Sequence, residues 1–306
     1  MKLHQLTALV IASESGSLRQ AAQKMRLSQP ALSRSIRELE AELGVKLLDR
    51  TALGVEATAY GKALILRSRI IESELRQAKD DIAQLRAATH GDLRIGATPV
   101  AAFSLLPPVL ARIKKAKPKL RVTVSEAIGT SLIGRLRQGD FDFAFGRIFE
   151  DIDPHEFTTE ALFNDSLVVV SRRDHPLLKA GRKIDWEMCE WILPGNDSPA
   201  RIAFQRAFYE KTGRAPRCTM DSDSFMTMLT IISQTDLLGV APHQIFRTTW
   251  LQREFATPDL GLKFPSQPTG IIRRAKSTPS TAAQYAIKEL RHAAQQIKTA
   301  KRNAGA

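Results

Sequence analysis

The chain has 306 residues, with 45 Lys and Arg against 32 Asp and Glu and a formal net charge of +13 at pH 7. This length exceeds one ordinary domain, and a composition of 43% hydrophobic and 25% charged residues excludes a predominantly disordered chain. Such a basic protein suggests a polyanionic partner, either nucleic acid or an acidic membrane surface. No apolar run approaches the roughly 18 residues of a membrane span, and the first residues lack a signal-peptide core. We therefore expect a cytoplasmic protein with no membrane partner.

The sequence predicts no catalytic residue, no metal and no cofactor. The two cysteines, Cys189 and Cys218, are too few for a disulfide framework and lack the spacing of zinc ligands. We interpret them as ordinary thiols, with a redox switch as the alternative. The histidines lack a His-Glu-x-x-His spacing, and neither a Gly-x-Ser-x-Gly elbow nor a phosphate-binding Gly-x-x-x-x-Gly-Lys loop occurs. An enzyme built from distant residues, an exported solute-binding protein and a nucleoid protein remain as rival functions.

The positive charge is spread along the chain. Residues 1–90 carry 14 basic and 10 acidic side chains, so only +4 of the net charge lies there. Local density is more informative, because five basic side chains and no acidic ones occur from Ser17 to Arg37. A second basic cluster at residues 112–121 is more typical of a solvated helix face.

The amino-terminal residues predict three short helices. Apolar residues recur at helical spacing over residues 3–12, and Gly16 ends this helix. Ser17 followed by Gln20 is a capping-box pattern that begins a second helix. Residues 28–30, Ser-Gln-Pro, offer a cap and an early proline for a third. Three capped helices of this length indicate a helix-turn-helix unit.

The third helix separates its residues by face. At about 100° per residue, one face carries the apolar side chains of Leu32, Ile36, Leu39 and Leu43. The opposite face carries Pro30, Ser33, Arg34 and Arg37, with Gln29 at the amino end. A helix of this kind can enter the major groove of DNA, where Arg reads guanine and Gln reads adenine. A solvated amphipathic helix is the alternative, but the preceding helices and the acid-free stretch favour DNA binding.

A small wing is expected after the third helix. Residues 45–50 and 55–58 predict two short strands, joined by a turn at residues 52–54. Arg50 lies at the base of this wing, where it could reach a phosphate or the minor groove.

A long helix is predicted from residue 58 to about residue 88, because this stretch contains no proline and only Gly61 weakens it. Apolar residues alternate spacings of four and three at Ile71, Leu75, Ala78, Ile82 and Leu85, as in the seam of a coiled coil. The seam covers only about two heptads, short of a firm assignment. Pairing with a second subunit and packing on its own domain therefore remain open.

The amino-terminal motifs together resemble those of the LysR-type transcriptional regulators of bacteria. They are Gly16-Ser17-Leu18, Ala21-Ala22, the run from Leu27 to Ser33, Ile36 to Glu40, Leu43-Gly44, Leu47 to Arg50 and Thr58-x-x-Gly61. The rest of the chain matches the family in layout and length, and only loosely in sequence. The resemblance implies an α/β protein with an amino-terminal winged helix-turn-helix, a linker helix and a two-lobed periplasmic-binding-protein-like (type 2) α/β effector domain.

The implied domains are a DNA-binding domain at 1–58, a linker and dimerisation helix at 59–90 and an effector domain at 91–306. Within the effector domain, lobe I covers about 91–165 and 269–300, and lobe II covers about 166–268.

The resemblance also implies partners and DNA contacts. Family members are usually homotetramers that bind double-stranded promoter DNA and alter transcription when a small metabolite binds. The expected partners are DNA, an effector, a second subunit paired through the linker helix, and RNA polymerase. The resemblance assigns Ser17 to phosphate, Gln29, Pro30, Ser33 and Arg34 to base edges, and Arg50 to the wing; Arg37 joins them from the face analysis. Leu53 departs from the basic residue common at this wing position, which puts minor-groove insertion in doubt.

Strands and helices alternate after His90-Gly91, which predicts a doubly wound lobe with parallel strands. The predicted strands are 93–97, 120–126 and 141–145, with helices at 100–114 and 130–137. A second lobe is expected from the strands 167–171, 191–193 and 237–241 and the helix 199–211. Residues 271–272 and a helix at 281–298 return to the first lobe. Trp191 and Trp250 are expected in the core.

Ligands of such sheets bind beyond the carboxyl ends of the strands, so the cleft between the lobes is the expected effector site. The candidates are Thr98, Pro99, Thr130, Ser131, Phe145, Arg147, Pro194, Asn196, Ser222 and Ser224. For Thr130 and Ser131 simple helix capping is the alternative, and Arg147 either pairs with a carboxylate or is solvated. A hydroxyl and free backbone donors at Thr98 suit an anion. We therefore expect a small anionic effector, such as an aromatic or short organic acid.

Overall fold

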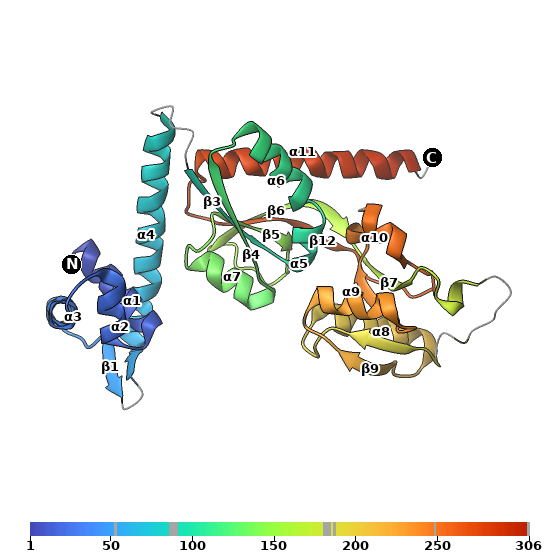
Figure 1. Ribbon diagram of the computed structural model, residues 1–306, viewed down its shortest axis with the longest axis horizontal. Coiled ribbons are helices and arrows are strands. Elements are labelled where there is room, and N and C mark those ends of the chain that lie inside the picture. Colours follow the sequence, from blue (N-terminus) through green and yellow to red (C-terminus); the bar gives the residue numbers. More distant parts are fainter. Residues whose placement is uncertain (52–53, 86–90, 180–184, 186–187, 248, 305–306) are drawn as a thin grey trace.

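The computed structural model describes residues 1–51, 54–85, 91–179, 185, 188–247 and 249–304. Its parts follow one another along the molecule, as Figure 1 shows. A small helical domain with a two-stranded wing comes first, one long helix rises from it beside a central lobe, and a second lobe lies at the far end.

The first domain is the predicted helix-turn-helix. Its helices are α1 (Leu3–Ser15), α2 (Leu18–Met25) and α3 (Gln29–Leu43). Gly16 ends α1 in the left-handed conformation at φ 60°, which glycine adopts without strain. The side chain of Ser28 accepts a hydrogen bond from the backbone N of Ala31 and caps α3, a contact worth about 1 kcal/mol. Leu32 and Ile36 of α3 are buried against α1 and α2, so the three helices share one core.

The wing consists of β1 (Leu48–Thr51) and β2 (Gly54–Ala57), paired antiparallel. The first strand begins three residues later than predicted. The reason is Glu40, whose Oε1 accepts hydrogen bonds from the backbone N atoms of Leu47 and Leu48 at 2.8 and 3.2 Å and holds the preceding segment against α3. Leu53 lies outside the described residues, so its departure from the family pattern has no structural account.

The predicted long helix is α4 (Ala59–Leu85). It begins close to the wing, where Thr58 accepts a hydrogen bond from the backbone N of Gly61 at 3.0 Å. Gly61 is needed at this point because a Cβ atom there would overlap the carbonyl oxygen of Leu47. The helix then continues past α1 to lobe I, and Thr7 of α1 donates a hydrogen bond to Glu72 at 2.6 Å.

Lobe I is a five-stranded sheet with the order β4-β3-β5-β12-β6. The strands are β3 (Gly91–Ala97), β4 (Leu120–Glu126), β5 (Phe143–Arg147), β6 (Phe157–Asp165) and β12 (Gln267–Arg274). The first three are parallel, as predicted, whereas β12 is antiparallel to both β5 and β6. The helices are α5 (Pro99–Phe103), α6 (Leu106–Ala116), α7 (Gly129–Arg137) and α11 (Thr281–Ala304). α6 and α11 pack on one face of the sheet and α7 on the other.

Two predictions for lobe I were wrong. The helix expected at 100–114 is two helices, α5 and α6, and the second carries a proline in its first turn. Pro107 and Pro108 lack the backbone N–H that a continuous helix would need, so the chain turns and restarts. The third strand is β5 (Phe143–Arg147) and not 141–145. Phe141 packs against α7, and the carboxylate of Asp142 accepts a hydrogen bond from the backbone N of Arg94, so both residues precede the strand.

Lobe II contains two smaller sheets. β10 (Gly239–Pro242) and β11 (Phe255–Ala256) pair antiparallel with β7 (Leu167–Arg172), and β8 (Glu190–Leu193) runs parallel to β9 (Arg217–Asp221). The helices are η1 (Pro176–Leu178), α8 (Pro199–Thr212), α9 (Phe225–Gln234), η3 (His243–Arg247) and α10 (Thr249–Glu254). Trp191 is fully buried beside Phe204 and Phe208, as predicted for a core residue. The side chain of Trp250 lies outside the described part.

The lobes are connected by chain crossings that include a strand absent from the prediction. β6 ends at Asp165 and β7 starts at Leu167, so only Ser166 separates a strand of lobe I from one of lobe II. β12 returns to lobe I at Gln267, two residues before the expected position, and pairs with Asp165 at that point. The crossings place the end of β6 and the start of β12 at the boundary between the lobes.

Replacing Gly61 by Ala tests the close approach of α4 to the wing. We expect the free energy of unfolding to fall by about 1–3 kcal/mol, because the added methyl group must displace the backbone at Leu47. Gly134 in α7 is the matched control, since nothing described lies within 4 Å of a Cβ atom there. Gly134→Ala should leave stability unchanged or raise it by up to about 1 kcal/mol. Urea unfolding followed by circular dichroism measures both, and equal responses would contradict the packing.

Candidate functional site

The outward face of α3 carries the predicted DNA-reading side chains. Leu32 and Leu39 are fully buried, whereas Arg34 and Arg37 are exposed on the other side of the helix. The Arg34 guanidinium donates to Glu38 at 3.0 Å and its side chain is 79% exposed. An exposed pair of this kind contributes about 0–1 kcal/mol. Arg34 can therefore leave Glu38 and turn toward a DNA base at little cost.

The other predicted DNA contacts lie near this face. Gln29 and Pro30 are exposed in the first turn of α3, and Ser33 is half-buried one turn later. The hydroxyl of Ser17 accepts from the backbone N of Gln20 at 3.5 Å, a long hydrogen bond at the start of α2. Arg50 is the third residue of β1, and its side chain lies outside the described part. These assignments stay predictions.

The seam of α4 is exposed. Ile71, Leu75 and Ile82 keep 37%, 40% and 58% of their surfaces accessible, and Ala78 between them is also exposed. The side chain of Leu85 lies outside the described part. Ser73 and Gln77 are buried on the other side of the helix. The helix therefore packs on its own chain with one face and leaves the seam available.

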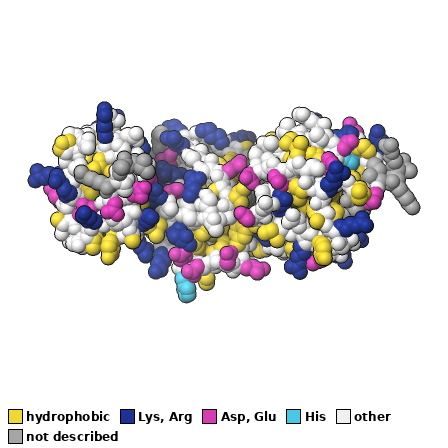
Figure 2. Space-filling view, turned by 90° about the horizontal axis from the view of Figure 1, so that it is seen from below, with side chains coloured by type: hydrophobic (Ala, Val, Ile, Leu, Met, Phe, Trp, Pro, Cys, Tyr) yellow, Lys and Arg dark blue, Asp and Glu magenta, His cyan; other side chains and the backbone are white. Residues whose placement is uncertain are grey.

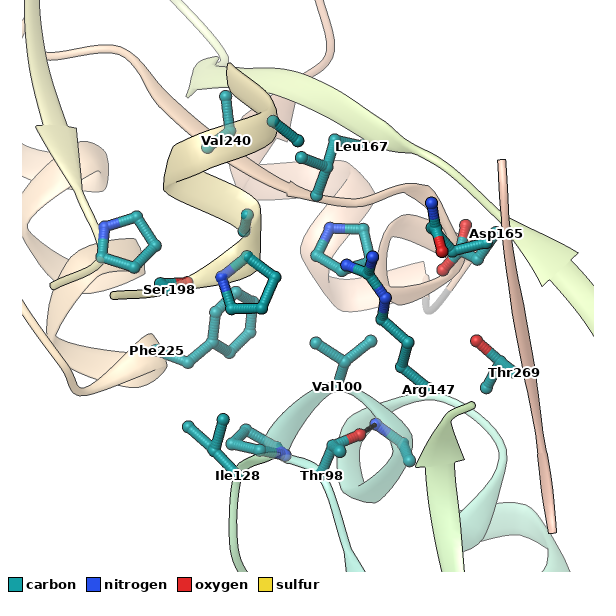
Figure 3. A pocket seen from close by; sticks show the side chains of 18 of the residues that line it. Thr98, Val100, Ile128, Arg147, Asp165, Leu167, Ser198, Phe225, Val240 and Thr269 are labelled. Carbon is teal, nitrogen blue, oxygen red and sulfur yellow. Dashed lines mark hydrogen bonds between the residues drawn. The ribbon is translucent and has the colours of Figure 1, made fainter. Parts of the chain in front are cut away.

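A cavity of about 220 Å³ lies between the two lobes. Five of the predicted effector residues line it: Thr98, Pro99, Arg147, Pro194 and Ser222. Figure 3 shows Thr98 and Arg147 on lobe I facing Ser198 and Phe225 on lobe II, with Asp165 and Leu167 at the crossing. Both lobes thus contribute to one site beyond the carboxyl ends of β3 and β5, where ligands of such sheets bind.

The other five predicted effector residues lie outside the lining. The side chain of Phe145 is fully buried in the core of lobe I, because residues within a central strand alternate between the two covered faces. Ser224 uses its hydroxyl to cap α9, accepting from the backbone N of Thr227 at 3.3 Å. Thr130 and Ser131 lie in the first turn of α7, and Asn196 lies in the loop after β8. Their roles stay predictions.

Most of the lining that the sequence did not indicate is apolar and comes from elements of both lobes as well as from the crossings. It includes Val100, Ile128, Phe149, Phe163, Leu167, Phe225 and Val240, together with the polar side chains of Asp165, Gln267 and Thr269. The pairing of Gln267 with Asp165 joins positions about a hundred residues apart, and the bulge at Thr269 follows. Local patterns carry no signal for such a contact.

Arg147 is the only arginine or lysine in the described lining of this cavity. Burial lowers the pKa of its guanidinium, and the nearby carboxylate of Glu150 partly opposes this effect. Its Nε atom is buried without a hydrogen-bond partner among the described residues, and its guanidinium carbon lies 5.6 Å from the centre of the Phe149 ring. A partly buried guanidinium whose Nε atom has no hydrogen-bond partner is unfavourable. The site is therefore prepared for a negatively charged group.

Thr98 lies close to Arg147 in this site. Its backbone N donates to the carbonyl oxygen of Phe145 at 3.1 Å, and its hydroxyl accepts from the backbone N of Ala101 at 3.4 Å. A Cβ atom at Gly146 would lie 2.9 Å from the Thr98 hydroxyl, so only glycine lets Thr98 pack this close to β5. The hydroxyl retains its own proton, which it can donate to an anion.

The cavity also contains an acidic side chain. Asp165 is 8% exposed, and its carboxylate accepts from the backbone N atoms of Ser166 at 2.9 Å and Gln244 at 3.4 Å. These donors hold the carboxylate at the end of β6, where it borders the same cavity as Arg147. Asp223 also lines the cavity, so two anionic groups and one cationic group face a largely apolar space. This arrangement suits a ligand that combines an acid, a hydrogen-bond donor and a hydrocarbon body.

The described residues contain no group of three or more His, Cys, Asp and Glu side chains arranged to hold a metal ion. Cys189 and Cys218 are both unpaired and half-buried. Burial raises the pKa of each thiol, and Asp185 and Asp221 respectively add to the effect. Raised pKa values lower the thiolate fraction at neutral pH, which is the direction expected for ordinary thiols. None of the described helices has the length and hydropathy to cross a membrane.

On Figure 2, which views the molecule from below, Lys and Arg side chains lie over all parts of the surface and are interspersed with acidic ones. The net charge of the effector half is therefore not gathered into one basic surface on this face. The DNA-binding interpretation accordingly depends on the geometry of α3 and not on the total charge.

Known protein families and structures match this chain over most of its length. The family described as bacterial regulatory helix-turn-helix protein, lysR family, matches residues 3–62, and the LysR substrate binding domain matches residues 86–295. The transcriptional regulator GbpR of Azospirillum brasilense is 31% identical over 96% of this chain and 86% of its own length. The SDS degradation transcriptional activation protein of a Pseudomonas species is 30% identical over 92% and 93%. Full-length CbnR, crystallised with its target DNA, shares the fold with a TM-score of 0.67 at 21% identity, over 96% and 100%.

Proposed function

The chain belongs to the LysR family of bacterial transcriptional regulators, with a DNA-binding helix-turn-helix and an effector-binding domain, and we propose that its effector is a small organic anion bound in the interlobe cavity. The observation that carries this proposal is Arg147, a desolvated guanidinium without a hydrogen-bond partner for its Nε atom. The proposal includes no catalytic step, no cofactor and no metal.

The body of the effector is expected to be apolar, because Phe149, Phe163 and Phe225 line the cavity together with aliphatic side chains. The acid would bind between Arg147 and the hydroxyl of Thr98. A hydroxyl or amino group of the ligand would donate to Asp165 on the crossing strand. An aromatic or short aliphatic acid that carries one such donor fits this arrangement, and a cavity of about 220 Å³ suits a small molecule of this kind.

DNA recognition is proposed for the outward face of α3. Arg34, Arg37 and Gln29 supply bidentate side chains at positions where a helix in the major groove contacts base edges. Ser17 would contact a phosphate at the start of α2, and Arg50 would reach the backbone or minor groove from the wing. From this DNA binding we infer that the protein acts in the cytoplasm of a bacterium.

Dimerisation is proposed through the seam of α4, which exposes Ile71, Leu75 and Ile82 in a single chain. Pairing two such helices buries these side chains, at about 25 cal/mol per Å² of apolar surface removed from water. A two-fold dimer would present two recognition helices to two DNA half-sites. Two dimers would form the homotetramer usual in the family, with RNA polymerase as the partner through which transcription changes.

Replacing Arg34 by Ala tests the recognition helix. We expect the variant to lose about 1–3 kcal/mol of discrimination between its binding site and altered sequences, because it removes a bidentate base contact. Lys79→Ala on α4 is the control, since it removes the same charge from an exposed side chain outside the DNA-binding domain. Fluorescence anisotropy with DNA fragments selected by the purified protein and with scrambled DNA measures the ratio. Unchanged discrimination in Arg34→Ala would contradict the assignment.

Replacing Arg147 by Gln, or Thr98 by Val, tests the anion site. Isothermal titration with a panel of aromatic and short aliphatic acids should identify ligands of the wild-type protein, and each variant should weaken their binding. The loss of a charge-assisted hydrogen bond predicts about a 10-fold or larger decrease for Arg147→Gln. Arg214→Gln, which removes an exposed arginine of lobe II, should leave affinity unchanged. Tight binding restricted to neutral or cationic compounds would overturn the proposal.

A further inference from the structure

Helix α4 contacts lobe I through a second stripe of side chains on one face. The stripe consists of Arg69, Ser73, Arg76 and Gln77, which fall within roughly 100° of one another at about 100° per residue. Ser73 and Gln77 are 1% and 6% exposed, in contrast to the seam residues. The seam centres on the opposite side of the helix. α4 is therefore held by its own lobe I on one face while the face proposed for dimerisation stays open.

Helix α4 packs tightly against the turn after α7. Gly139 has a φ of 80°, and a Cβ atom there would lie 2.9 Å from the Cβ of Ser73, so any larger residue would push the lobe away. The guanidinium of Arg76 donates to the carbonyl oxygen of Gly139 at 3.2 Å. One residue further along α4, the amide of Gln77 donates to the carboxylate of Asp142 at 3.4 Å.

Arg274 fixes the same helix from the end of β12. The side chain is 9% exposed, and its Nη1 atom donates to the carbonyl oxygens of Leu136 and Phe141, both at 3.3 Å. Its Nη2 atom pairs with Glu74 at 3.3 Å. Arg274 therefore links two carbonyl oxygens of lobe I to a half-exposed carboxylate on α4. Loss of the carbonyl contacts would leave a buried guanidinium unsatisfied.

These contacts lie at the far ends of the two strands that reach the cavity. β5 starts directly after Asp142 and ends at Arg147, which borders the cavity. β12 runs the other way, from Gln267 at the cavity to Arg274 at α4. The two strands are hydrogen-bonded neighbours, with Thr269 opposite Arg147. One pair of strands therefore connects the effector cavity to the linker helix.

Arg69 extends the connection to the DNA-binding domain. Its guanidinium donates to Glu14 of α1 at 2.8 Å and also to the side chain of Gln138 in lobe I. A single side chain on α4 thus contacts the helix-turn-helix domain and the effector lobe together.

We propose that these contacts form a clasp that transmits occupancy of the cavity to α4. The clasp comprises Arg69, Glu74, Arg76 and Gln77 on the helix and Gln138, Gly139, Asp142 and Arg274 on lobe I. An anion that draws Arg147 and Thr269 together shifts β5 and β12 relative to each other, and the clasp converts this shift into a displacement of α4. The proposed dimer seam lies on the same helix, across from Arg69, Arg76 and Gln77. The displacement therefore changes the spacing of the two recognition helices in a dimer. The inference rests on the proposed effector site.

Hydrogen exchange on the full-length protein tests the clasp without any effector. Coupling is reciprocal, so a change in the α4 contacts must alter the cavity, and a change at the cavity must alter the α4 contacts. Glu74→Ala/Gln77→Ala should raise exchange in residues 69–77 and also, by about threefold or more, in residues 267–270 at the cavity. Conversely, Arg147→Gln should alter exchange in residues 69–77. Lys79→Ala, an exposed residue of the same helix, should change neither segment.

Gln77→Glu serves as a second variant, because it places a carboxylate against Asp142 and opens the clasp by repulsion without shortening a side chain. Changes confined to α4 and residues 136–142 in both clasp variants would overturn the proposal. Fluorescence anisotropy with selected DNA is measured in parallel on the wild-type protein. Failure of the wild-type protein to discriminate DNA sequences would contradict the proposed function, and it would leave the exchange comparison valid.

Discussion

Helix α4 must satisfy two packing requirements at the same time, and the arrangement of the whole molecule depends on how it does so. One face contacts lobe I through Ser73 and Gln77, which are buried. The opposite face leaves Ile71, Leu75 and Ile82 exposed. Sequence alone left pairing with a subunit and packing on the chain itself as alternatives, and the structure shows that the second occurs on a face that does not exclude the first.

The ion pairs of the effector half show which of its basic side chains are already neutralised. Many of its arginines are occupied: Arg112 with Glu289, Arg137 with Glu156 and Arg291 with Glu160. In the pair of Glu160 and Arg291, the hydrogen bond lowers the pKa of the carboxyl group and raises that of the guanidinium. Arg147 differs from these residues, because its Nε atom is buried without a hydrogen-bond partner among the described residues, although Glu150 is close enough to raise its pKa. The net charge of +13 therefore says less about ligands than the position of one desolvated arginine.

Local signals in the sequence were sufficient for the DNA-binding domain. Caps at Ser17 and Ser28, the glycine at 16 and the helical period fix three helices without reference to the rest of the chain. Local signals also indicated Thr98 and Arg147 as cleft residues, because each lies at the carboxyl end of a predicted parallel strand, where ligands bind. Both residues line the cavity.

The sequence did not predict features that depend on contacts between segments far apart in the chain. β6 carries Thr158, Thr159 and Glu160, so its sequence resembles a surface loop until β12 pairs with it more than a hundred residues later. Asp165 owes its place in the cavity to that pairing. The clasp escaped for the same reason, since Gln77 and Arg274 are unremarkable polar residues until the fold brings lobe I against α4.

The central claim is that this chain is a dimeric, sequence-specific regulator whose recognition helices are spaced by α4. Sequencing the genomic fragments retained by the purified full-length protein, followed by footprinting of the enriched DNA, tests it most directly. The account predicts one enriched motif with two related half-sites, whose centres are separated by a whole number of helical turns of about 10.5 base pairs. Retention of fragments without a shared motif, or protection of a single half-site, would contradict it.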